Sequence, residues 1–118
     1  GSGGSNDAVN ASEVIVVMNQ TRTRFVEKVP YLTCPGDRVK TLVSEFGIFE
    51  KIGDHNELTL TGCLPNPGMP VLEDRIKAVQ DNCGWTVKVA ASVEDIPMPD
   101  HNELVLLRVF DPKGYFRV

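Results

Sequence analysis

The side chains best suited to chemistry are two histidines and three cysteines. His55 and His101 are each followed two positions later by a carboxylate, at Glu57 and Glu103, and these donor types can together bind zinc. A strong zinc signature has paired Cys or His ligands at short spacing within one loop, whereas each histidine here stands alone. Both histidines are more typical of turns, so we predict no metal site.

The cysteines form no catalytic pattern. A nucleophilic cysteine needs a histidine base, and no motif places one beside Cys34, Cys63 or Cys83. Cys83 falls on an apolar helical stripe and is expected in the core, whereas Cys63 is expected on the wetter face of its strand. The sequence allows either a Cys34–Cys63 disulfide or free thiols, and it does not decide between them. We therefore predict no catalytic residue, no cofactor and no enzymatic activity.

Composition describes an ordinary folded protein. The 118 residues are enough for one domain, with 42% hydrophobic and 24% charged residues. Twelve Lys and Arg stand against sixteen Asp and Glu, for a net charge of −4 and no basic block, so nucleic acid is not an expected partner. No apolar run approaches the roughly 20 residues that span a bilayer, so we expect no membrane span.

The expected organisation is a flexible tag or linker over residues 1–12 and a single α+β domain over residues 13–118. A hairpin of strands is predicted first, at residues 14–18 and 25–31. The other predicted strands lie at residues 48–52, 58–64, 85–93, 104–110 and 115–118. They are rich in β-branched residues or alternate in polarity.

Two helices are predicted from apolar spacing. Residues 37–46 carry apolar side chains at i, i+3, i+4 and i+7, and Gly47 would close that helix as a C-terminal cap. Residues 72–83 carry a second apolar stripe, closed by Gly84. The sequence DHNEL occurs at residues 54–58 and again at 100–104, each time ahead of a predicted strand. The chain is thus predicted to be a hairpin followed by two helix-strand-strand units.

This order of elements resembles the short N-terminal domain, often called N0, of outer-membrane secretins and signalling TonB-dependent receptors. The resemblance covers residues 25–109 and rests on the two glycine-closed helices and on the strands LTLTG and WTVKV. It implies two helices packed between two small mixed β-sheets and no catalytic site. It also implies a periplasmic, non-enzymatic docking domain of a secretion, pilus or conjugation machine. Partners would be other envelope-complex proteins or further copies of this chain.

Strands at both chain ends would leave open sheet edges that favour association. We predict partner binding by the edge residues Val14, Val16, Met18, Tyr115, Phe116 and Val118. The alternative is a ubiquitin-like or Ras-association-like module that binds a signalling protein in the cytoplasm. It is suggested by a hairpin followed by PGDRV and a helix, but the second helix is longer than that fold normally provides.

Overall fold

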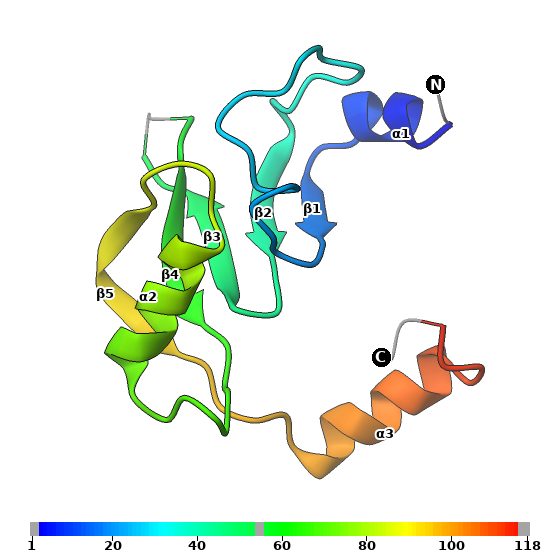
Figure 1. Cartoon of the computed structure of the whole chain (residues 1–118). Coiled ribbons are helices and arrows are strands. Elements are labelled where there is room, and N and C mark those ends of the chain that lie inside the picture. Colours follow the sequence, from blue (N-terminus) through cyan, green and yellow to red (C-terminus); the bar gives the residue numbers. More distant parts are fainter. Residues whose placement is uncertain (1–2, 54–55, 116–118) are drawn as a thin grey trace.

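The structure, a computed structural model, describes residues 3–53 and 56–115. Strands form the middle of the chain, and helices lie at both ends and between β4 and β5 (Figure 1). The elements are α1 Gly3–Asn10, β1 Val14–Val17, β2 Val39–Val43, β3 Gly47–Lys51, β4 Leu58–Cys63, α2 Leu72–Asp81, β5 Lys88–Asp95 and α3 His101–Phe110.

The described strands form one mixed sheet in the order β1-β2-β3-β4-β5. β1 is parallel to β2, the two middle pairs are antiparallel, and β4 is parallel to β5. The prediction of two small sheets with two helices between them is therefore wrong. Two successive hairpins add β3 and β4 to the sheet that β2 begins, so no second sheet arises among the described strands. The predicted N-terminal hairpin is wrong too, because β1 pairs with β2 in parallel.

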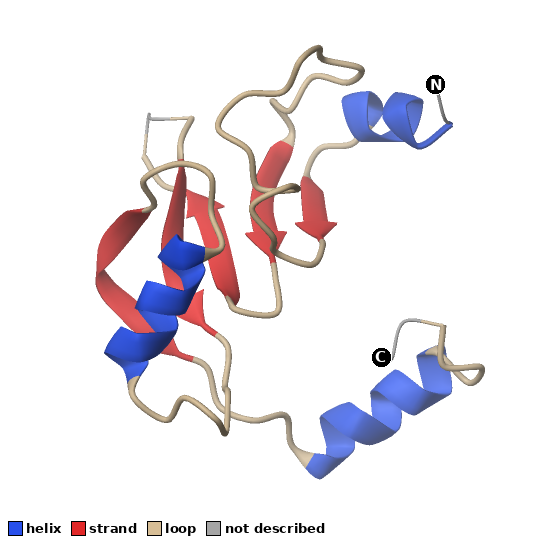
Figure 2. Cartoon of the chain, viewed as in Figure 1, coloured by secondary structure: helices blue, strands red, loops and turns tan. Residues whose placement is uncertain are grey.

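The core lies between α2 and the middle of the sheet. Helix α2 packs over β4 and β5, while α3 stands apart from the sheet (Figure 2). Phe49 of β3, Leu60 of β4 and Val79 of α2 are all but completely buried. Cys63, predicted on a wetter face, is fully buried as well. β4 lies between β3 and β5, and several residues on both of its faces are covered.

Residues 37–46 form no helix, so that prediction is wrong. They contain β2 and a tight turn made by Ser44, whose N–H donates to the Gly47 carbonyl at 2.9 Å. The Ser44 hydroxyl oxygen also accepts from the N–H groups of Phe46 and Gly47, at 3.2 and 3.1 Å. The β-branched residues of β2 favour an extended chain, and pairing with β1 and β3 outweighs the helical spacing.

The predicted strand at residues 25–31 is also wrong, because this segment lies in the connection between β1 and β2. Phe25 nevertheless reaches the core, where its ring stacks on Trp85 with centroids 5.8 Å apart. The Phe25 carbonyl accepts from the Gly84 N–H at 2.7 Å. Phe25 is thus anchored by the core and by the loop that follows α2.

The predicted strand at residues 104–110 is wrong because α3 occupies it. The Asp100 carboxylate accepts from the Glu103 N–H, and the Glu103 carboxylate accepts from the Asp100 N–H, each at 2.8 Å. This reciprocal capping box starts a helix. The second DHNEL sequence therefore caps a helix, whereas the first precedes β4, with Asp54 and His55 outside the described residues. The two predicted helix-strand-strand units do not exist.

Other predicted elements are confirmed. β1, β3, β4 and α2 occupy the segments predicted at residues 14–18, 48–52, 58–64 and 72–83. β5 begins later than predicted, because the Gln80 side chain binds the Trp85 carbonyl and the Val87 N–H at 2.9 and 2.8 Å. Tyr115 is not in a strand, and the rest of the strand predicted at residues 115–118 lies outside the described residues.

Residues 1–12, predicted to be a tag or linker, contain α1. The Cys34 thiol donates to the Ser5 carbonyl at 3.6 Å and so joins α1 to the connection between β1 and β2. The division into a linker and a single domain stays a prediction. None of the helices described has the length and apolarity that a membrane crossing requires.

Candidate functional site

A cleft lies where β4 and β5 end. Because these strands are parallel, their carboxyl ends share one edge of the sheet, which is where ligands of open α/β sheets commonly bind. Two adjoining cavities of about 440 and 490 Å³ lie there. Both are lined by Pro65 from the loop after β4 and by Ile96, Pro97 and Met98 from the segment after β5. The shared wall is apolar and, through its prolines, stiff.

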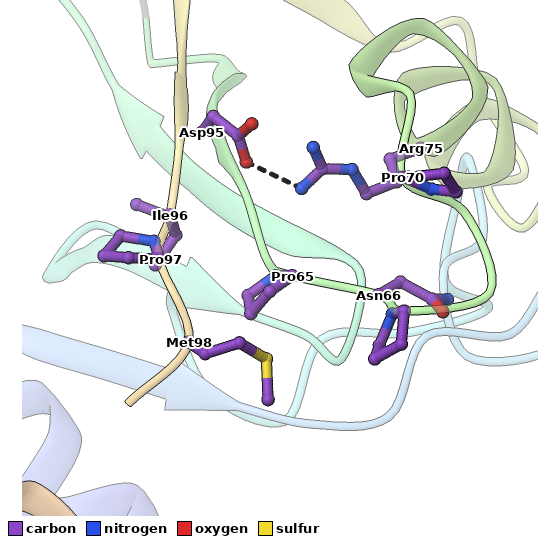
Figure 3. A pocket seen from close by; sticks show the side chains of 9 residues that line it. Pro65, Asn66, Pro70, Arg75, Asp95, Ile96, Pro97 and Met98 are labelled. Carbon is purple, nitrogen blue, oxygen red and sulfur yellow. Dashed lines mark hydrogen bonds and ion pairs between the residues drawn. The ribbon is translucent and has the colours of Figure 1, made fainter. Parts of the chain in front are cut away.

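An ion pair closes one end of the cleft. Arg75 Nη1 donates to Asp95 Oδ1 at 2.8 Å and to the Leu64 carbonyl at 3.2 Å, so it joins α2 to the ends of β4 and β5 (Figure 3). Arg75 is only 5% exposed. The hydrogen bond to Asp95 raises the pKa of Arg75, and the same bond lowers the pKa of Asp95. The pair is therefore fully charged at neutral pH.

The sequence of α2 explains why a guanidinium reaches this place. Arg75 lies three residues after Leu72 and four before Val79, on the stripe that packs on the sheet. The aliphatic part of the Arg75 side chain lies among the apolar residues between α2 and the sheet, and its guanidinium lies at the cleft. Its Nε is buried and has no hydrogen-bond partner among the described residues.

Carboxylates border the other end, where Glu45 and Glu103 line the second cavity. Glu45 sits in the turn between β2 and β3, and its Oε2 accepts from the Gln20 N–H at 2.7 Å. Glu103 belongs to the capping box of α3. Each carboxylate is thus held in place by a backbone N–H, and both give this end of the cleft negative charge.

A buried hydrogen-bond network supports the Glu45 turn. The Ser44 hydroxyl donates to Gln20 Oε1, and Gln20 Nε2 donates to the Val79 carbonyl, both at 2.8 Å. Gln20 and Ser44 are almost completely buried. Buried polar groups with partners restrict the backbone to one arrangement, so this network fixes the turn against α2.

The cleft can accommodate an elongated ligand with an apolar body. Its walls are proline, isoleucine and methionine, with a paired cation at one end and carboxylates at the other. Apolar lining with a few placed polar groups is typical of small-molecule sites.

The cysteines do not join this site as nucleophiles. Burial raises the pKa of the Cys63 thiol more than the nearby Arg75 charge lowers it, and burial also raises the pKa of Cys83. Both thiols therefore stay protonated at neutral pH. Cys34, Cys63 and Cys83 are all free, so the Cys34–Cys63 disulfide does not occur in this structure.

Of the two histidines, His101 is the one that the structure describes. His101 is the first residue of α3, while His55 lies outside the described residues. Within residues 3–53 and 56–115, no three His, Cys, Asp or Glu side chains are grouped so that they could hold a metal ion.

The predicted edge residues have mixed positions. β1 is an edge strand with β2 as its neighbour. Val14, Val16 and Met18 are half-buried, whereas Ile15 and Val17, which the prediction omitted, are exposed. Tyr115 is exposed, and Phe116 and Val118 lie outside the described residues. Partner binding by the predicted residues stays a prediction.

Sequence reasoning missed Arg75, Asp95 and Glu45, and it considered Glu103 only as a possible zinc ligand near His101. One signal was available: Arg75 interrupts the apolar stripe of α2, and a charged residue there needs a buried partner. Asp95 and Glu45 carry no comparable local signal, because they meet the cleft only through strand pairing and a hairpin turn.

Known proteins resemble this chain in sequence and in structure, although no family model matches it. The chain is 25% identical, over 96% of its length, to a subunit of 3-oxoadipate CoA-transferase from Pseudomonas knackmussii, and this covers 47% of that protein. Its structure is similar to that of glutaconate coenzyme A-transferase from Acidaminococcus fermentans, with a TM-score of 0.74 and 24% sequence identity. This match covers 98% of this chain and 48% of that chain. The structure is also similar to that of the decarboxylase AibA/AibB, with a TM-score of 0.63 and 23% sequence identity. This match covers 87% of this chain and 40% of that chain.

These similarities overturn the family suggested by the order of elements. The fold is that of CoA-transferase subunits, so the resemblance to secretin N0 domains is wrong, and so is the ubiquitin-like alternative. The prediction of a non-enzymatic envelope docking domain is contradicted, because the relatives are enzymes and one is a subunit of an enzyme. The misplaced strand at α3 and the misplaced helix at β2 produced the false pattern. The chain spans about half the length of the relatives that it matches.

Proposed function

We propose that this chain is part of a CoA-transferase, an enzyme that moves coenzyme A from an acyl-CoA to a carboxylic acid. One observation carries the proposal: a comparison of sequence and a comparison of structure each find a CoA-transferase over nearly the whole chain. The named substrates of those two relatives, 3-oxoadipate and glutaconate, are both dicarboxylates. We therefore propose a dicarboxylate, or its CoA ester, as the substrate class.

Only the apolar part of the cleft supports such a ligand. Its wall of Pro65, Ile96 and Met98 suits a carbon chain, whereas the carboxylates at one end would repel a carboxylate group, so the proposal does not rest on the charges of the cleft. The chain covers about half of each CoA-transferase that it matches, so the complete enzyme would need further polypeptide. We call this the complementary polypeptide: the stretch, encoded in the same gene or elsewhere in the source genome, that resembles the uncovered part of the glutaconate CoA-transferase chain.

The test is a transfer assay on the assembled protein. The chain is co-expressed with the complementary polypeptide and incubated with acetyl-CoA or succinyl-CoA and with glutaconate or 3-oxoadipate. Mass spectrometry should detect a new dicarboxylyl-CoA thioester and an equal amount of released acetate or succinate. The matched controls are each polypeptide alone.

Two results would contradict the proposal. One is the absence of any new thioester with all pairs of donor and acceptor. The other is release of CO2 from a dicarboxylyl-CoA without transfer, which would place the chain with the decarboxylase AibA/AibB.

A further inference from the structure

We propose that α3 is a docking helix that binds the complementary polypeptide. This inference rests on the proposed function for the identity of that partner. None of the α3 residues is buried, although six of the ten are large and apolar. They are Leu104, Val105, Leu106, Leu107, Val109 and Phe110, with exposed fractions from 36% to 83%.

The apolar residues surround the helix. Leu104 to Leu107 are consecutive and therefore point in four directions about 100° apart. A helix that is apolar on all sides is normally buried inside a larger structure. An apolar surface of this kind marks a site of interaction when nothing in its own chain covers it.

α3 is preformed and held away from its own sheet. The capping box of Asp100 and Glu103 stabilises its first turn. The segment that precedes it contains Pro97 and Pro99, whose fixed φ angles favour an extended spacer. Figures 1 and 2 show α3 apart from α2 and the sheet. Because the helix is already ordered, binding would cost little conformational entropy.

The length of the relatives identifies the partner. The structural match covers 98% of this chain, and α3 is too long to fall outside it, yet the match covers only 48% of the glutaconate CoA-transferase chain. The unmatched part of the glutaconate CoA-transferase chain is therefore about as long as the matched part. Insertion of an apolar helix into a groove of that polypeptide is an established mode of recognition.

A second copy of this chain offers a poorer receptor. A ten-residue helix with side chains is about 15 Å long and about 10 Å wide, or roughly 1,200 Å³. The two cavities of the cleft measure about 440 and 490 Å³, so neither could enclose such a helix. A second copy would therefore have to offer another surface, such as its own α3, and the experiment tests this by looking for a dimer of the chain alone.

The experiment compares Leu106→Asp and Phe110→Asp with Ile52→Asp. Ile52 is a matched control because it is 50% exposed, close to the 55% of Leu106, and follows β3 instead of lying on α3. Each variant is co-expressed with the complementary polypeptide. Light scattering after gel filtration gives stoichiometry, and titration calorimetry gives affinity.

The wild-type chain and Ile52→Asp should form a one-to-one complex, while the α3 variants should bind at least about tenfold more weakly. Hydrogen exchange of the α3 amides should slow in the wild-type complex. Equal affinity for all variants, or no complex with the wild-type chain, would overturn the proposal. So would a dimer of the chain alone that the α3 variants disrupt, because α3 would then pair with a second copy.

The two proposals can fail separately. A complex that depends on α3 but transfers no CoA would reject the proposed function and leave the docking helix standing. CoA transfer that is unaffected in Leu106→Asp and Phe110→Asp would reject the docking helix and leave the function standing.

Discussion

Arg75 shows how one buried charge organises the cleft. Its guanidinium joins α2, the Leu64 carbonyl after β4 and Asp95 at the end of β5. A buried charge is costly unless it is paired and hydrogen-bonded, and here both conditions are met at Nη1. Asp95 remains more than half exposed, so solvent screens the attraction and the pair contributes modestly to stability.

The Asp95 carboxylate should give folding a measurable dependence on pH in acid. Its pKa is lower in the folded chain than in the unfolded one, so the unfolded chain binds more protons and stability rises with pH. The contribution is complete above the unfolded pKa of about 3.9 and is lost as pH falls through the folded pKa. Asp95→Asn should therefore flatten the fall in unfolding free energy below about pH 4, measured by urea denaturation.

The control for this experiment is Arg75→Met, which removes the cause of the lowered Asp95 pKa. In that background, Asp95→Asn should have little further effect on the slope. Identical slopes for wild type and Asp95→Asn would show that the ion pair is absent in solution.

A close backbone approach favours glycine at position 84. A Cβ atom at this position would lie 2.5 Å from the Phe25 carbonyl oxygen and 3.1 Å from Val26 Cα. Backbone atoms cannot move aside cheaply, so Gly84→Ala should destabilise the chain by about 1–3 kcal/mol in thermal or urea unfolding. Gly36→Ala is the matched control, since no atom lies within 4 Å of its added Cβ. Equal stability of the two variants would contradict this packing.

Among the elements, α3 begins with a capping box but buries none of its residues against the rest of the described chain. Asp100→Ala removes the cap, and this should cost α3 about 1 kcal/mol of local stability. Since no α3 residue is buried, global unfolding of the isolated chain should change little. Amide exchange measured by NMR should therefore accelerate in α3 alone. Asn102→Ala, also exposed on α3, should not accelerate it. Loss of protection in the sheet would show that α3 packs there.

β1 and β5 are the two edge strands of the described sheet, and each has one neighbouring strand. The segment after β5 lines the cleft, whereas β1 exposes the apolar side chains of Ile15 and Val17. The prediction that the N-terminal strand binds a partner thus concerns a true sheet edge. Its exposed side chains alternate with those chosen from the sequence, because successive strand residues point to opposite faces.

At the scale of the whole molecule, the sheet and α2 form a packed core, and α3 projects from it. Replacing a phenylalanine with alanine should have different effects on the stability of these two parts. Phe49→Ala removes an aromatic ring that is 1% exposed and should cost about 3–5 kcal/mol. Phe110→Ala removes one that is 83% exposed and should change the unfolding free energy by less than about 0.5 kcal/mol.

Urea unfolding of the isolated chain gives both values. A comparable loss from the two substitutions would mean that α3 belongs to the core of this chain, which would also remove the reason for a docking helix.

The elements that the sequence predicted well are those whose signals are local. The apolar stripe of α2, the β-branched run of β1 and the alternation in β4 all depend on residues within a few positions of one another. Composition likewise indicated a folded domain of ordinary polarity. In these segments, local preference and final packing agree.

Tertiary structure alone decided the rest. The segment that became β2 fits the spacing of a helix and of a strand, and the continuous apolar run of α3 fits either. Pairing with β1 and β3 selected the strand, and capping by Asp100 selected the helix. The cleft depends on β4 and β5 being parallel neighbours, which brings Arg75 and Asp95 together across twenty positions of sequence. Such contacts arise from long-range packing, which the spacing of residues along a chain does not encode.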